Sequence, residues 1–161
     1  MQLDDFWYNG TDAAHMRVSD PWGNRTLYPR GISGLAQALD LPLAIYANHF
    51  SADFPMLQRN DSFAVTSLLG GRGVVPVGAS SHGFYSRLFQ YWQDAANMVA
   101  FEVDFLSTFV FHTPAFQTAV EGAAMWLDGL ASAAHERGVA VQFCTATAYD
   151  AIQALQYPGG G

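Results

Sequence analysis

The chain has 161 residues, of which 50% are hydrophobic and 14% aromatic, enough apolar material for one core of ordinary domain size. Its seven positive side chains, all arginine, are outnumbered by fourteen aspartates and glutamates, and the net charge of -7 excludes a basic surface for nucleic acid. No apolar run is long enough to cross a bilayer, and the single cysteine, Cys144, excludes an internal disulfide. We therefore expect one domain over residues 1–161, with neither nucleic acid nor a membrane as partner.

Four short runs rich in β-forming residues are spaced along the chain. They cover residues 2–6, 43–47, 99–105 and 139–144, and each is almost continuously apolar. This pattern is typical of strands that are buried on both faces of a parallel sheet.

Helical patterns follow each of these runs. Residues 32–39, 81–98 and 114–137 carry apolar side chains at helical spacing, and 149–156 begins a further helix. In the segment 114–137, Pro114 suits the first turn and Gly138 suits the C-terminal cap. The repeated order of strand and helix implies right-handed crossovers and a parallel sheet, and so predicts an α/β fold.

The scale of the repeat suggests a particular architecture. A (β/α)₈ TIM barrel uses about thirty residues per unit, and the units here are somewhat longer. We predict a partial (β/α)₈ barrel of about four parallel strands, with the chain as an internal fragment of a larger barrel. The largest insertion, 51–80, contains two runs, 63–69 and 74–77, that could pair as a small hairpin.

Functional groups of such barrels lie at the C-terminal ends of the strands. Polar and aromatic residues gather at all four predicted ends, whereas the strand starts are small and apolar. The residues at these ends are Asp4, Asp5, Trp7, Tyr46, Asn48, His49, Glu102, Asp104, Ser107, Cys144, Thr145 and Thr147.

Asp104 is the strongest single candidate for a catalytic residue. It lies in an apolar strand, where an ionised carboxylate costs several kcal/mol unless it is paired or functional. Glu102 is two residues earlier, so both side chains should point to the same side of the strand. The structural alternatives are that Asp104 caps the next turn and that Glu102 pairs with an arginine.

The pair Asp4 and Asp5, followed by Trp7, suggests a sugar site. Carboxylates accept hydrogen bonds from vicinal hydroxyl groups, while the C–H face of a sugar packs on an aromatic ring. An ordinary strand-end turn beside a core tryptophan fits the same residues.

The remaining candidates are weaker. His49 has no second histidine or cysteine at metal-ligand spacing, so we expect no metal and no cofactor. Cys144 lies in an apolar strand without a nucleophile motif and is best explained by packing. Trp92 and Trp126 fall in helical apolar stripes and are expected in the core.

Several motifs together resemble a known family. The segment at 3–7, Leu-Asp-Asp-Phe-Trp, resembles a strand end of the α-galactosidase and raffinose-synthase superfamily, in glycoside hydrolase families 27 and 36. The segment at 28–32 resembles the helix entry of that superfamily, and 43–46 its next strand. Residues 101–104 then correspond to the strand that carries the nucleophilic aspartate, and 138–144 to the strand after it.

The resemblance implies a retaining α-glycosidase, in which one aspartate attacks the anomeric carbon and a second carboxylic acid protonates the leaving oxygen. It makes Asp104 the nucleophile and places Asp4, Asp5, Trp7, Tyr46, His49, Glu102 and Cys144 around a carbohydrate substrate. The family's acid/base aspartate follows on the next strand, and no matching motif follows Cys144 here. This fragment alone is therefore expected to be inactive.

One departure bears on the substrate. Many members carry a lysine where this chain has Glu102, and a glutamate there would repel an ionised nucleophile. A carbohydrate-binding barrel without catalysis therefore stays an alternative. So does a complete small α/β domain that binds a metal or a phosphosugar.

Overall fold

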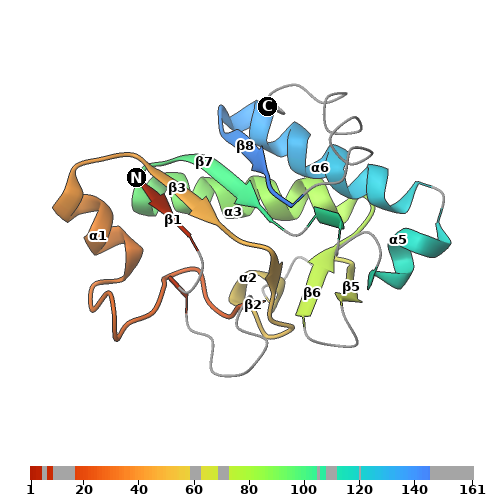
Figure 1. Ribbon diagram of the computed structural model, residues 1–161, viewed down its shortest axis with the longest axis horizontal. Coiled ribbons are helices and arrows are strands. Elements are labelled where there is room, and N and C mark those ends of the chain that lie inside the picture. Colours follow the sequence, from red (N-terminus) through yellow and green to blue (C-terminus); the bar gives the residue numbers. More distant parts are fainter. Residues whose placement is uncertain are drawn as a thin grey trace.

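The computed structural model describes residues 1–4, 7–8, 17–58, 63–68, 73–104, 106–107, 112–119 and 121–145. These residues form an α/β fold in which the longer helices α3 and α6 lie behind a parallel sheet (Figure 1). None of the helices described in these ranges is long and apolar enough to cross a membrane.

The main sheet has four strands, and all its neighbouring strands are parallel. The strands are β1 (Gln2–Leu3), β3 (Leu43–Tyr46), β7 (Met98–Val103) and β8 (Ala140–Phe143), in the order β1-β3-β7-β8. The four predicted strands and their common direction are confirmed. The sheet is open, so the described residues form a four-stranded parallel sheet without a closed barrel.

The strand register separates the two faces of this sheet. Leu3, Ile45, Phe101 and Val141 are aligned across the four strands and are all buried. The row beside it carries Gln2, Ala44, Ala100 and Ala140, which are half-buried or exposed. In these two rows the large apolar side chains lie on the face that packs against the helices. The predicted burial on both faces is observed at Tyr46 and Glu102, which are buried, but not at the neighbouring row.

Helices α1 (Gly31–Leu39), α3 (Ser80–Ala96) and α6 (Gly122–Arg137) connect the strands. Each of them ends at a residue in the left-handed conformation: Asp40 with φ 50°, Asn97 with φ 49° and Gly138 with φ 64°. Gly138 is thus confirmed as a C-terminal cap. The predicted helix 149–156 lies outside the described residues.

The segment 114–137, predicted as one helix, is divided into two. Helix α5 (Pro114–Thr118) stops because Ala119 is extended, with φ -106° and ψ 122°. Helix α6 then starts at Gly122, where an added Cβ would lie 2.5 Å from the carbonyl oxygen of Ala115. Pro114 stands in the first turn, as predicted, but of the shorter helix.

A second sheet lies beside the carboxyl end of the first. It contains β2 (Arg17–Val18), β4 (His49–Phe50), β5 (Val65–Leu68) and β6 (Gly73–Pro76), in the order β2-β4-β6-β5. Strands β5 and β6 are antiparallel, which confirms the predicted hairpin within 51–80. A short helix, α2 (Pro55–Gln58), precedes this hairpin.

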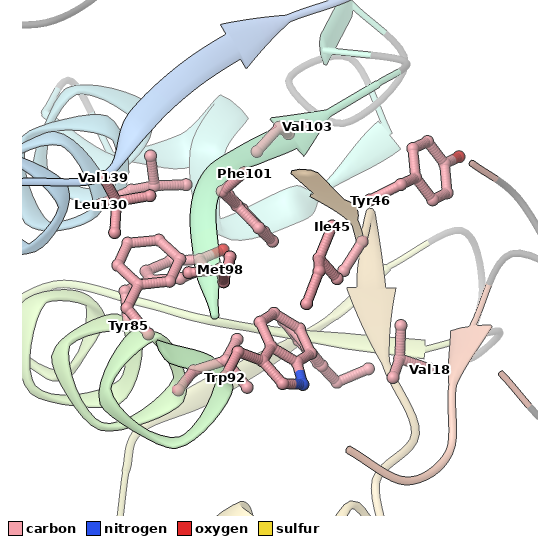
Figure 2. Packing of buried hydrophobic residues seen from close by; sticks show 14 of the residues in the cluster. Val18, Ile45, Tyr46, Tyr85, Trp92, Met98, Phe101, Val103, Leu130 and Val139 are labelled. Atoms are coloured by element: carbon pink, nitrogen blue, oxygen red, sulfur yellow. The ribbon is translucent and has the colours of Figure 1, made fainter. Parts of the chain in front are cut away.

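Aromatic side chains fill the core between the main sheet and its helices (Figure 2). The Trp92 ring stacks on Phe101 at a centroid distance of 6.0 Å and meets Trp7 edge-on at 5.7 Å. Trp126 is fully buried and its indole N–H donates to the Tyr85 hydroxyl at 3.1 Å. Trp92 and Trp126 are thus core residues, as predicted, and burial raises the pKa of Tyr85.

Candidate functional site

The carboxyl ends of β3, β7 and β8 meet at one edge of the main sheet. Tyr46 is paired in register with Glu102, and Glu102 with Gln142. Ile45 and Tyr46 extend to opposite sides of β3, so Tyr46 lies on the face away from the helices (Figure 2). The predicted convergence of polar strand ends is therefore observed for these three strands.

Glu102 is buried at this edge, with 6% of its surface exposed. Its Oε2 accepts a hydrogen bond from Gln2 Nε2, which reaches across from β1, and its Oε1 accepts from Gln142 Nε2 at 3.3 Å. The Cys144 thiol also bonds to Glu102. Within the described ranges, the recorded partners of this carboxylate are two amides and a thiol, and a buried carboxylate needs such donors.

Cys144 follows β8 and is half-buried. Its hydrogen bond to Glu102 is the main cause that raises the pKa of the Cys144 thiol. The Gln142 amide, which donates to Sγ at 3.3 Å, lowers this pKa, while burial and the charges of Glu102 and Asp104 raise it. The thiol is therefore protonated at neutral pH and acts as a hydrogen-bond donor rather than as a nucleophile.

Asp104 lies just beyond the end of β7 and is half-buried. Its backbone N–H donates to Asn48 Oδ1 at 2.9 Å, and its Oδ1 accepts a hydrogen bond from Thr145 Oγ1. The charges of both Glu102 and Asp104 raise the pKa of the Cys144 thiol. That the two carboxylates point to one side of the strand stays a prediction from their sequence parity.

Tyr46 links this edge to the core. It is 1% exposed, and its hydroxyl oxygen accepts a hydrogen bond from Asn48 Nδ2 at 2.7 Å. Its backbone carbonyl accepts from Trp7 Nε1 at 2.7 Å. Trp7 is 2% exposed and packs against Trp92, so its indole supports Tyr46 from within the core.

His49 belongs to the second sheet rather than to the main one. It lies in β4, is 4% exposed, and packs its ring against Gly73, where an added Cβ would be 2.0 Å from the ring carbon Cδ2. It is adjacent in sequence to Asn48, but the structure places its ring against β6.

Asp4 follows β1 and is exposed, at the same edge of the sheet as the other strand ends. Asp5 lies outside the described residues, and so does Thr147. The role that the sequence suggests for the Asp4 and Asp5 pair stays a prediction.

Two residues of this edge, Gln2 and Gln142, were not singled out from the sequence, and neither was the link that Asn48 makes to Asp104. Gln142 and Glu102 are paired in register, but only a known register reveals this. In the described ranges, no group of three or more histidine, cysteine, aspartate or glutamate side chains could hold a metal ion. The groups of this edge that are exposed or half-buried are the carboxylates of Asp4 and Asp104, the amide of Gln142 and the thiol of Cys144, which can form hydrogen bonds with hydroxyl groups.

Solved structures with a similar fold are known. An α-galactosidase from Lactobacillus brevis matches with a TM-score of 0.59 and 15% identity, over 89% of this chain and 22% of that one. The GH36 α-galactosidase from Geobacillus stearothermophilus matches with a TM-score of 0.48 and 16% identity, over 89% of this chain and 23% of that one. No protein-family model and no curated protein matches the chain.

The chain thus spans less than a quarter of the α-galactosidases that it resembles, 22% in the first case. At 15% identity this likeness concerns the fold, and by its fold the chain is similar to one part of a bacterial α-galactosidase.

Proposed function

We propose that the chain forms part of the active site of a retaining α-glycosidase of the α-galactosidase type, which hydrolyses or transfers O-glycosidic bonds. The observation that carries the proposal is the placement of Asp104 at the carboxyl end of a parallel strand, where barrel enzymes hold their reactive groups. The likeness in fold to an α-galactosidase supports it.

In this proposal Asp104 is the nucleophile. One of its carboxylate oxygens attacks the anomeric carbon and forms a glycosyl ester, while the bond from that carbon to the leaving oxygen breaks. The hydrogen bond from Thr145 Oγ1 to Oδ1 fixes the rotation of the carboxylate, so the other oxygen has a defined direction. Water then cleaves the ester and regenerates Asp104.

The second group in a retaining mechanism is a carboxylic acid about 5 Å from the nucleophile, which protonates the leaving oxygen. We assign this role to no residue of the described chain. In this proposal the acid belongs to a strand other than β1, β3, β7 and β8.

The sugar would lie over the edge formed by the strand ends. Asp4 and Asp5 would accept hydrogen bonds from sugar hydroxyls, and the protonated Cys144 thiol would line the site beside Asp104. Glu102 and Tyr46 are almost fully buried and would act through their hydrogen bonds to Cys144 and Asn48. Trp7 and His49 complete the set. Because both are almost fully buried, they would act by supporting Tyr46 and the loop that follows β3.

A covalent inactivator tests the assignment of the nucleophile. The complete protein would be incubated with an activated 2-fluoro-α-glycoside, digested, and analysed by mass spectrometry for the peptide that carries the sugar. We expect the label on Asp104 and its loss in Asp104→Asn. Asp128→Asn, which changes an exposed aspartate of α6, is the matched control and should label like the unchanged protein.

A label on another residue, or turnover without any label on Asp104, would contradict the proposal. Sugar binding without turnover, measured by calorimetry on the same protein, would instead favour the alternative of a carbohydrate-binding barrel without catalysis. The alternative is favoured by the presence of both Glu102 and Asp104 at this edge, because the negative charge of one carboxylate disfavours ionisation of the other.

A further inference from the structure

Asn48 is a buried polar residue at the point where the two sheets meet. It follows β3 and precedes β4, and only 2% of its surface is exposed. A buried amide is costly unless its donors and acceptor are bonded, so its partners indicate what it is for.

Both halves of the Asn48 amide are used. Oδ1 accepts from the backbone N–H of Asp104 at 2.9 Å, and Nδ2 donates to the hydroxyl oxygen of Tyr46 at 2.7 Å. The orientation of the amide is fixed, because a backbone N–H can only donate and Oδ1 must face it. Nδ2 then faces Tyr46, and the phenolic hydrogen of Tyr46 must point away from Asn48.

The bond to Asp104 starts where the regular sheet ends. Ala47 N donates to Glu102 O at 3.1 Å, and Cys144 N donates to Val103 O at 2.9 Å, which are the last backbone bonds of β7 to its two neighbours. At Asp104 the Asn48 side chain takes over the role of acceptor. It therefore extends the fixed part of β7 by one residue, to the residue that is proposed to react.

Asp104 is held from both neighbouring strand ends. Asn48, after β3, fixes its backbone, and Thr145, after β8, fixes its carboxylate. Thr145 has a left-handed backbone with φ 46°, which is unusual for a β-branched residue, and Ser107 donates to its carbonyl through Oγ at 3.1 Å. Strained backbone of this kind persists where the surroundings determine it, often at functional sites.

We propose that Asn48 is a positioning residue for the reaction of Asp104, setting the backbone of the nucleophile and the direction of the Tyr46 hydroxyl with one amide. This inference rests on the proposed function, because positioning has a meaning only if Asp104 reacts. An error of about 1 Å in the position of a reacting group can slow a reaction about 100-fold, so loss of this bond should act on the rate rather than on substrate binding.

Two variants of the complete protein test the role. Asn48→Leu keeps the approximate size and removes both hydrogen bonds, whereas Asn48→Asp keeps an oxygen that accepts from Asp104 N–H. We expect Asn48→Leu to lower kcat about 100-fold with little change in KM, and Asn48→Asp to restore part of the rate. Hydrogen exchange, followed by mass spectrometry of the peptide that contains Asp104, should become faster in Asn48→Leu and stay slow in Asn48→Asp.

Asn24→Leu is the matched control. The Asn24 side chain accepts from the backbone N–H groups of Thr26 and Leu27 in an exposed turn, so this variant also loses two side-chain hydrogen bonds, neither of which involves β3, β7 or β8. We expect a lower melting temperature with unchanged kcat and KM. If Asn48→Leu does not fold, the test uses Asn48→Asp alone, by its kcat and by hydrogen exchange of the peptide that contains Asp104.

The outcomes separate this inference from the function on which it rests. Unchanged kcat in folded Asn48→Leu, or unchanged exchange at Asp104, would overturn the positioning role even in an active glycosidase. If the unchanged protein gives neither turnover nor label while exchange at Asp104 still responds to Asn48→Leu, the proposed function is overturned, and the positioning role with it. A fall in kcat that accompanies faster exchange, and that Asn48→Asp partly reverses, supports both.

Discussion

The Gln142 amide donates to the Glu102 carboxylate across the pair β7 and β8, with 3.3 Å between Nε2 and Oε1. The same nitrogen lies 3.3 Å from Cys144 Sγ, so one exposed side chain bonds both the buried carboxylate and the thiol. A change at Gln142 should therefore act on both groups.

Removal of this donor should destabilise the protein. Gln142→Leu leaves Glu102 with fewer hydrogen-bond donors, so we expect the free energy of unfolding to fall by about 1 kcal/mol. This value is at the low end for a hydrogen bond to a buried charge, because the bond is long. Urea unfolding measures the change. Gln37→Leu, on the exposed side of α1, is the control and should stay within about 0.5 kcal/mol of the unchanged protein.

The Cys144 thiol should react slowly with iodoacetamide at neutral pH, because its hydrogen bond to Glu102 raises its pKa above the ordinary 9.0. The chain has no other cysteine, so the rate of alkylation against pH reports this group alone. In Glu102→Gln the negative charge is lost, and the pKa of Cys144 should fall toward its ordinary value. A thiol that titrates at or below 9.0 in the unchanged protein would contradict the geometry.

The same group makes stability depend on pH. Because the folded state raises the pKa of Cys144, the folded chain holds this proton more tightly than the unfolded chain does. The contribution of Cys144 to stability is complete at pH values below the pKa of this thiol in the unfolded chain. It is lost as the pH rises through the higher pKa of the thiol in the folded chain. Unfolding of Cys144→Ser, measured from pH 8 upward, should lack this component.

Gly73 should not accept a side chain. An added Cβ would lie 2.0 Å from His49 Cδ2, so Gly73→Ala must displace the buried ring, and we expect a loss of about 1–3 kcal/mol. The combination with His49→Ala should cost less than the sum of the two single changes, since the clash is removed. Gly83→Ala, in helix α3, is the control: an added Cβ would lie 3.3 Å from Phe63 Cε1, so this change should cost much less than Gly73→Ala.

Thr145→Val tests the bond to the carboxylate of Asp104. It removes the hydroxyl that donates to Oδ1 and keeps the branched shape. We expect labelling of Asp104 by the inactivator to slow about 10-fold, which corresponds to about 1.4 kcal/mol in the barrier. Thr145→Ser retains the donor and should label at nearly the original rate; equal slowing in both variants would count against a role for the hydroxyl.

The sequence predicts the strands and the direction of the main sheet because their signals are local. The runs at 43–47 and 99–105 are apolar over their own length, and Gly138 marks a helix end by its own backbone freedom. The division between α5 and α6 is not predicted, because apolar spacing continues through 114–137 while the break depends on the extended backbone of Ala119.

The partners of Glu102 could not be predicted either. Gln2 is 100 residues away in sequence and Gln142 is 40, and only the order β1-β3-β7-β8 brings them to the same carboxylate. The sequence suggests an arginine as the partner of Glu102, whereas the partners found among the described residues are the neutral side chains of Gln2, Gln142 and Cys144. Asn48 was visible as a strand-end residue, but its link to Asp104 depends on how β3 and β7 are aligned.

The left-handed residue Asn97 lies between α3 and β7, at the far end of the strand from Glu102. Because side chains alternate along a strand, one residue inserted after Asn97 would exchange the directions of Glu102 and Val103. The carboxylate would then turn toward the apolar face of the sheet that packs against the helices, and Phe101 would take its place opposite Gln142. The direction of the Glu102 side chain therefore depends on the length of the turn at Asn97, five positions upstream, where helix α3 ends.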